Sequence, residues 1–241
     1  YILDRSTRAL TRLTTTRVRI SPTWSAEGNR LVSRDGTTGD VSWQSRDGST
    51  APEFLVAKPS AGGIRELVIA PDGQTIAMEV ALGDKSAIYI SKVGGKASDA
   101  RLFADNAEHP KWSADGKWIA YQASTGDKNR IIAHAYPAGG TMQVSEDAGS
   151  HPVWPRGSKT IYYESERNII AADIEETQGG LRVTSRRVLW RGKSSSERAD
   201  DQFVNYDVSP QGDLLVLEST SAGRTKVVVE LNWASQLRKK M

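Results

Sequence analysis

The segment that decides the fold prediction is residues 110–121, which read PKWSADGKWIAY. Near its start it has the apolar residue Trp112, it then passes through Asp115 and Gly116, and it continues with a run of aromatic and aliphatic residues. Adjacent Asp and Gly are typical of a tight turn, because Asp accepts hydrogen bonds from nearby backbone amides and Gly adopts a positive φ without steric cost. The segment therefore predicts two antiparallel strands joined by a short turn.

The same pattern recurs along the whole chain. Its turn glycines are Gly28, Gly73, Gly116, Gly157 and Gly212, at intervals of 45, 43, 41 and 55 residues. A period of about 40–45 residues is that of a four-stranded propeller blade. The pattern therefore predicts that each repeat is one blade.

Further strands are expected within each repeat. Residues 87–90 and 130–133 predict third strands, and residues 101–103 and 142–144 predict fourth strands that follow a second glycine turn. The sequence thus predicts an all-β propeller of four-stranded blades. Five blades are expected, with six as the alternative if part of a blade lies outside this chain.

The two ends of the chain suggest how such a ring closes. The last repeat offers only three strands, whereas residues 9–14 form a strand without an obvious partner. We expect this strand to complete the last blade, because an unpaired edge is otherwise left exposed. A short helix is expected over residues 232–240, and residues 175–180 and 194–202 are expected to be exposed loops. The chain is expected to be a single propeller domain, 1–241, and a piece of a longer protein.

Composition limits the possible functions. The chain has 32 Lys and Arg residues against 29 Asp and Glu residues, a balance that does not favour a nucleic-acid binder. It has no cysteine, which excludes disulfides, thiolate metal sites and cysteine nucleophiles. No apolar run approaches the roughly 20 residues of a membrane helix. Basic residues gather over residues 182–198, which predicts a solvated outer strand or, alternatively, an anion-binding patch.

The repeat unit, Pro-x-Trp-Ser-x-Asp-Gly followed by an aromatic-rich strand, resembles the TolB-type, WD-like propeller repeat. Residues 110–121 are the nearest copy, and residues 22–28 follow it with Glu27 in place of Asp. The order of segments from residues 1–14 to residues 228–237 resembles the C-terminal propeller of bacterial membrane-anchored serine/threonine kinases or of TolB-like proteins. No kinase motif occurs in the chain. The resemblance implies an extracytoplasmic or periplasmic location, with a tether through an N-terminal region outside this sequence.

Candidate site residues come from one repeat position. His109 and His151 both stand immediately before a proline at the start of a blade, where the channel mouth of a propeller lies. The equivalent residues in the other repeats are Ser21, Glu66 and Asn205, which gives five candidates for a ligand site at the mouth. Two imidazoles and a carboxylate are typical ligands of a divalent metal, so His109, His151 and Glu66 are the metal candidates. The alternative is that all five are ordinary polar loop residues. His134 is expected to be structural.

Other conspicuous residues have structural explanations. Asp72 and Asp115 are expected to bind backbone amides inside their turns. Trp24, Trp112 and Trp154 recur at blade spacing and are expected to be wedges in the core rather than a platform for stacking bases.

We therefore expect a non-catalytic module for protein interaction or ligand sensing, without a cofactor. Its expected partner is a protein, a peptide or a cell-wall ligand, with no nucleic acid and no membrane contact by this segment itself. One alternative is a metal-dependent hydrolase or lactonase with an axial divalent ion. The other is a structural propeller that self-associates through an open blade edge.

Overall fold

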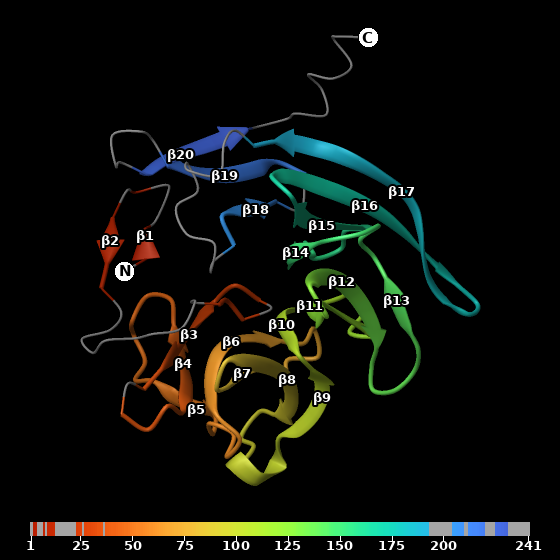
Figure 1. The fold of residues 1–241 in the computed structure, drawn as a ribbon. Coiled ribbons are helices and arrows are strands. Elements are labelled where there is room, and N and C mark those ends of the chain that lie inside the picture. The colour runs from red at the N-terminus through yellow and green to blue at the C-terminus, as the bar shows by residue number, and fades with distance from the viewer. Residues whose placement is uncertain are drawn as a thin grey trace. The chain divides into compact units, whose positions relative to one another are not determined.

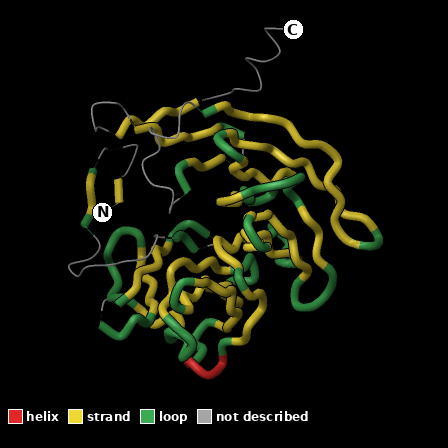
Figure 2. The backbone as a smooth tube through the Cα atoms, viewed as in Figure 1, coloured by secondary structure: helices red, strands yellow, loops and turns green. Residues whose placement is uncertain are grey.

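A computed structural model describes residues 2–3, 7, 9–12, 23–25, 27–35, 37–192, 204–209, 212–219 and 225–230. The chain divides into two compact units, Tyr1–Trp112 (unit 1) and Ser113–Met241 (unit 2). The helix expected over residues 232–240 and the loop expected over residues 194–202 lie outside the described residues. Within them the chain is built of strands, with a single 3₁₀ turn, η1 (Ala97–Asp99), as Figure 2 shows. No helix in this described part is long and apolar enough to span a membrane.

Unit 1 contains antiparallel sheets whose strands follow one another in sequence (Figure 1). The first sheets pair β1 (Ile2–Leu3) with β2 (Leu10–Thr11), and order β3 (Arg30–Arg34), β4 (Val41–Ser45) and β5 (Glu53–Val56). A four-stranded sheet orders β6 (Gly63–Ile69), β7 (Thr75–Leu82), β8 (Lys85–Lys92) and β9 (Arg101–Asp105). The last strand of the unit is β10 (Ala107–Trp112).

Unit 2 repeats the same arrangement. Its first strands, β11 (Trp118–Thr125), β12 (Lys128–Ala135) and β13 (Thr141–Gln143), are successive neighbours. A four-stranded sheet follows, formed by β14 (Ser150–Val153), β15 (Thr160–Ser165), β16 (Asn168–Thr177) and β17 (Gly180–Arg191). The last sheet orders β18 (Tyr206–Val208), β19 (Leu214–Ser219) and β20 (Thr225–Glu230). The predicted all-β fold with four-stranded sheets is confirmed.

The turn chemistry predicted from the repeat is confirmed as well. The five turn glycines have φ between 66° and 88°, a region that side-chain-bearing residues seldom adopt. The Asp72 carboxylate accepts hydrogen bonds from the backbone N–H groups of Gln74 (2.8 Å) and Thr75 (2.9 Å). The Asp115 carboxylate accepts one from the N–H of Lys117 (3.1 Å). Both acids therefore hold turns, as expected.

The inner strands are buried on both faces. In β7 every residue from Thr75 to Val80 is buried, and Ile76, Met78 and Val80 belong to a core cluster that also takes in β3 to β6. Strands β11 and β15 each have a run of four buried residues in unit 2. Continuous burial explains why these runs are mostly apolar instead of alternating between apolar and polar residues.

The three repeated tryptophans have different surroundings. Trp112 is 8% exposed, and its Nε1–H donates to the carbonyl of Val68 (3.3 Å). Trp154 packs at the edge of a core cluster in unit 2. Trp24, however, is 46% exposed and makes only an isolated bridge with Leu31, so its prediction as a core wedge is wrong. No regular strand holds the Trp24 backbone, so the ring is not fixed within a sheet.

The prediction of a loop over residues 175–180 is also wrong. Strand β16 runs to Thr177 and β17 starts at Gly180, so only a two-residue turn separates them. Ile174 pairs with Val183, and both belong to or pack against a core cluster with Leu181 and Trp118. Figure 1 shows this hairpin reaching beyond the rest of its sheet. Its apolar residues are too widely spaced among polar ones to indicate strands from the sequence alone.

The N-terminal segment has a partner that the sequence did not predict. Leu10–Thr11 pairs with Ile2–Leu3 in a two-stranded antiparallel sheet. Closure of the ring by residues 9–14, the number of blades and a single domain over 1–241 remain predictions.

Candidate functional site

The described site residues of unit 1 meet around the carboxylate of Glu66. Glu66 lies on β6, directly after a bulge between Ile64 and Glu66, and a bulge re-aims the side chains next to it. One carboxylate oxygen, Oε2, lies 2.9 Å from Nδ1 of His109, on β10. The other, Oε1, contacts the ammonium group of Lys111, two residues further along β10. The sequence placed Glu66 and His109 at equivalent repeat positions, and the fold brings them into contact.

Glu79, on β7, is a member of this cluster that the sequence analysis missed. Its Oε2 accepts a hydrogen bond from the backbone N–H of His109 (3.1 Å) and lies 3.8 Å from the His109 ring nitrogen Nδ1. Its Oε1 accepts a hydrogen bond from the hydroxyl of Ser86 (3.1 Å), and Nη1 of Arg65 lies 4.0 Å from the same oxygen. Glu79 is buried, with 3% of its surface exposed to solvent. A glutamate inside the apolar run of residues 75–80 was the available signal, because a buried charge needs a partner.

The two glutamates have opposite electrostatic responses. Burial alone would raise the pKa of Glu66, but the charge of Lys111 and the hydrogen bond from His109 outweigh it and lower this pKa to about 2. The pKa of Glu79 is raised, mainly by burial, because His109 offsets only part of the cost and Glu66 and Glu108 add like charge. Glu66 is therefore a stable anion, whereas Glu79 holds a proton more readily than an ordinary glutamate.

The contact between Glu79 and His109 recurs in unit 2 with different residues. Gln122 occupies in β11 the position that Glu79 occupies in β7, and its Oε1 accepts a hydrogen bond from the backbone N–H of His151 (3.1 Å). His109 and His151 both have positive φ, 55° and 52°. Non-glycine residues seldom adopt such angles, so a side-chain acceptor is needed to hold the N–H in place. This arrangement is a repeated structural device.

The remaining predicted site residues are placed as follows. His151 is buried, its Nδ1 lies 3.6 Å from Glu164, and its carbonyl accepts a hydrogen bond from the hydroxyl of Tyr206 (2.8 Å). Asn205 is buried in unit 2. Ser21 lies outside the described residues. His134 lies on β12, and its Nδ1 is 3.4 Å from the hydroxyl of Tyr121. Its pKa is lowered by burial, as suits a structural histidine.

A divalent metal is chemically compatible with part of the unit 1 cluster. Donor atoms of Glu66, Glu79 and His109 lie within 4.8 Å of one another, and carboxylate and imidazole groups are ordinary zinc ligands. This set differs from the predicted one by having Glu79 in place of His151. Lys111 competes with any ion, since its ammonium group already neutralises Glu66.

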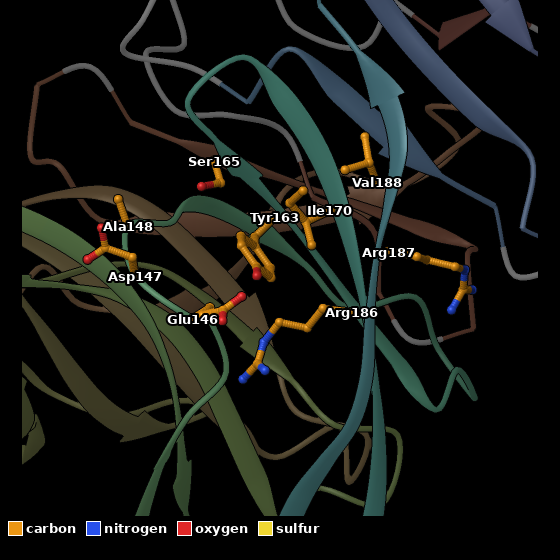
Figure 3. Close-up of a pocket in the computed structure, with 9 residues that line it drawn as sticks. All are labelled: Glu146, Asp147, Ala148, Tyr163, Ser165, Ile170, Arg186, Arg187 and Val188. Atoms are coloured by element: carbon orange, nitrogen blue, oxygen red, sulfur yellow. The ribbon is translucent and has the colours of Figure 1, made fainter.

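Unit 2 contains an open recess of about 300 Å³. Its apolar part comes from Ala148, Ile170 and Val188, with the ring of Tyr163. Charged side chains lie around this apolar part, which we call the floor of the recess, as Figure 3 shows. The lining is completed by Glu146, Asp147, Ser165, Arg186 and Arg187. The recess was not predicted, because its lining comes from three strands and a loop that no motif connects.

Two of the four arginines that the structure describes in the basic stretch predicted over residues 182–198 are paired with acids. Arg182 pairs with Glu175 (2.6 Å), and Arg187 pairs with Asp173. Both acids lie on β16, opposite or near their partners across the β16–β17 pair. These contacts favour the solvated outer strand over a broad anion-binding patch.

The sequence matches no protein-family model and no curated protein sequence. The structure, however, is similar to solved structures. It matches TolB from Agrobacterium tumefaciens with a TM-score of 0.63 at 19% identity, covering 88% of this chain and 76% of that one. It matches TolB from Acinetobacter baumannii with a TM-score of 0.56 at 14% identity, covering 88% of this chain and 54% of that one.

A third similar structure is a puromycin-hydrolysing peptidase from Mycobacterium tuberculosis. Its TM-score is 0.56 at 18% identity, and the match covers 88% of this chain but only 38% of the peptidase. Identities this low establish a shared fold and leave the function open. The chain therefore has a β-propeller fold, and its structural neighbours include TolB-type propeller proteins.

Proposed function

We propose that this chain is a non-catalytic interaction or ligand-sensing module that works on the extracytoplasmic side of a bacterial cell. Its expected partner is a protein, a peptide or a cell-wall ligand. The fold supports this role, because a propeller offers rigid loops and strands as a preorganised surface. The TolB-type neighbours are the reason for the proposed location.

The observation that carries the proposal is the recess of unit 2. It combines an open apolar floor with charged groups of both signs, a lining typical of a binding site. The acid and base groups of unit 1, in contrast, are engaged with one another: Glu66 with Lys111 and His109, and Glu79 with the His109 backbone. Such mutual neutralisation favours a structural role for that cluster.

The experiment is capture from an extract by the immobilised chain, with free chain as the competitor. Val188→Arg fills the recess, whereas Leu102→Arg places the same side chain on β9, the outermost strand of the sheet formed by β6 to β9. Both side chains are exposed, at 40% and 57%, so neither change disturbs a core. We expect the immobilised chain to retain a partner from the extract in a saturable way. The free chain is expected to displace this partner, and of the two variants only Val188→Arg is expected to lose it. Equal retention by both variants contradicts the role of the recess, and turnover of ester or lactone substrates contradicts the non-catalytic proposal.

A metal-dependent hydrolase is a second candidate, favoured by the proximity of donor atoms in Glu66, Glu79 and His109. It requires about one tightly held divalent ion per chain, which elemental analysis of the purified protein measures. Zinc titration of His109→Ala and Lys111→Met provides the matched pair. If the site binds metal, the first substitution weakens binding and the second strengthens it by removing the competing ammonium group. Negligible zinc binding by the parent chain and by both variants eliminates this candidate.

Self-association through an open blade edge remains a prediction as well. Light scattering during size-exclusion chromatography tests it, because the proposed module is expected to elute as a monomer and a structural assembly as an oligomer.

A further inference from the structure

We propose that the recess of unit 2 binds a free apolar α-amino acid, whose ammonium group is received by Glu146, whose carboxylate is received by Arg186, and whose side chain lies on Ile170 and Val188. This inference deepens the proposed ligand-sensing function and rests on it. Four features of the recess lead to it: its apolar floor, the two opposite charges in its lining, the hydrogen bonds that hold its loop and its size.

The floor is an apolar row across adjacent strands. Tyr163 pairs with Ile170 between β15 and β16, and Ile170 pairs with Val188 between β16 and β17. Val188 is 40% exposed although it stands in the middle of a long strand. An aliphatic side chain placed on this row removes apolar surface from water, which is favourable in proportion to the area covered.

Two opposite charges lie beside the floor. In Figure 3 the Arg186 side chain extends toward the loop that carries Glu146, whereas the Arg187 side chain points the other way, and both Glu146 and Arg186 line the recess. Within the described part of the chain, no ion pair is formed by either Glu146 or Arg186. Arg186 instead donates from Nε to the carbonyl of Val144 (2.8 Å) and hydrogen-bonds Tyr163. A guanidinium group has five N–H donors, so donors remain for a carboxylate.

The loop that carries Glu146 is held in place before any ligand arrives. The Gln143 side-chain amide donates to the carbonyls of Ser145 (2.9 Å) and Glu146 (3.1 Å). The Ser145 hydroxyl donates to the carbonyl of Asp147 (3.1 Å). Gly149 lets the loop press against the Tyr163 ring, because a Cβ there would lie 3.1 Å from that ring and 2.9 Å from Ile131. A preorganised loop lowers the entropic cost of binding.

The size of the recess and the two charges in its lining select the ligand class. A volume of about 300 Å³ is at the lower end for small-molecule sites, so it suits a ligand of amino-acid size. An α-amino acid carries its ammonium and carboxylate groups on one carbon, and a Glu and an Arg that line the same recess can receive one group each. Neighbouring Asp147 is already paired with Lys128 (2.7 Å), so it does not add a second free anion.

The test is isothermal titration calorimetry of the whole chain with L-leucine. L-leucinamide lacks the carboxylate and N-acetyl-L-leucine lacks the ammonium group, so each probe removes one of the two proposed contacts. We expect each to bind about tenfold or more weakly than leucine, because a hydrogen-bonded charge contributes roughly that factor. Glu146→Gln and Arg186→Gln are expected to weaken leucine binding by a similar factor.

Arg182→Gln is the matched control, since Arg182 lies on the same strand but is paired with Glu175 outside the recess. It is expected to bind leucine as the parent chain does, and circular dichroism verifies that all variants are folded. The inference is overturned if leucine gives no saturable heat, if N-acetyl-leucine binds as tightly as leucine, or if Glu146→Gln and Arg186→Gln bind normally. If the chain does not bind leucine but still captures a partner that Val188→Arg fails to capture, only the ligand class is wrong. If the chain neither binds leucine nor captures a partner through the recess, the proposed function is wrong as well.

Discussion

Among single residues, His109 and His151 share an unusual backbone conformation with positive φ. The backbone N–H of each donates to a side chain of an earlier strand. Glu79 accepts this hydrogen bond in unit 1 and Gln122 accepts it in unit 2. The acceptor is thus required for stability whether or not the site binds a ligand.

Replacing Glu79 tests this requirement. Glu79→Ala leaves the His109 N–H without its acceptor and is expected to cost about 1–3 kcal/mol of unfolding free energy, the usual cost of an unsatisfied buried donor. Glu79→Gln keeps an acceptor of the same shape and is expected to cost less. Urea denaturation measures both. Equal losses in the two variants would contradict the role of the hydrogen bond.

Glu66 predicts how stability depends on pH. Its pKa is about 2 in the folded protein, below its ordinary value of 4.5. Its contribution is therefore complete above pH 4.5 and is lost as the pH falls from 4.5 toward 2, a change of about 3 kcal/mol at about 1.4 kcal/mol per pKa unit. Glu79, whose pKa is raised, acts in the opposite direction, since its stabilisation is lost as the pH rises through its folded pKa.

Comparison of Glu66→Gln with the parent chain isolates this contribution. We expect the variant to lose less unfolding free energy than the parent chain between about pH 6 and about pH 3, because it has no carboxylate to titrate. Urea denaturation at both pH values gives the difference. Parallel pH profiles for the two proteins would show that the ion pairs of Glu66 do not stabilise the fold.

Residue-scale prediction from sequence succeeded where chemistry is local. Asp72 and Asp115 act on amides only two or three residues away, so their turns were predictable. The cluster partner Glu79 was missed because it is 30 residues from His109, and nothing local shows that the next blade brings them together. The recess was missed for the same reason.

At the scale of elements, the hairpin of β16 and β17 is the main departure from the repeat. Its outer part, residues 174–183, places Leu181 and Val183 against a cluster that includes Trp118 and Met142. Lys117 and Glu176 add an exposed pair (3.3 Å), which contributes little by itself. The hairpin therefore acts mainly through apolar packing against the strands before it in unit 2.

Shortening this hairpin tests that function. Ile174 and Val183 are directly paired, so Asn-Gly in place of residues 175–182 is expected to close the hairpin with a tight turn. We expect the thermal midpoint to fall by several degrees, because packing worth about 1–2 kcal/mol is lost. The double variant Glu175→Gln and Arg182→Gln, which removes only an exposed ion pair, is the control. An unchanged midpoint for the shortened chain contradicts the packing role.

Strand prediction followed the turn glycines and failed where composition masks a strand. The strands after Gly73 and Gly116 are rich in apolar residues and were correctly predicted. Residues 175–180 are polar because they project from the sheet into solvent, and a solvent-facing hairpin has no apolar run to identify it.

At the scale of the whole molecule, the all-β propeller fold was predictable because it depends on a period, which survives divergence of the individual residues. Closure of the ring depends on contacts between the two ends of the chain and remains a prediction. We predict that residues 1–14 complete the last blade and that their deletion lowers the thermal midpoint sharply, since it exposes a strand edge. Differential scanning calorimetry tests this, and an unchanged midpoint removes the closure proposal.

We propose that this chain binds a small ligand in the recess of unit 2, without metal-dependent chemistry. Methyl NMR of Ile170 and Val188 during titration with L-leucine tests it most directly, with Ile76 and Met78 in the core of unit 1 as internal references. The account predicts saturable shifts at Ile170 and Val188 alone, unchanged by a metal chelator. Unperturbed recess methyls, or shifts that appear only with a divalent ion, would contradict it.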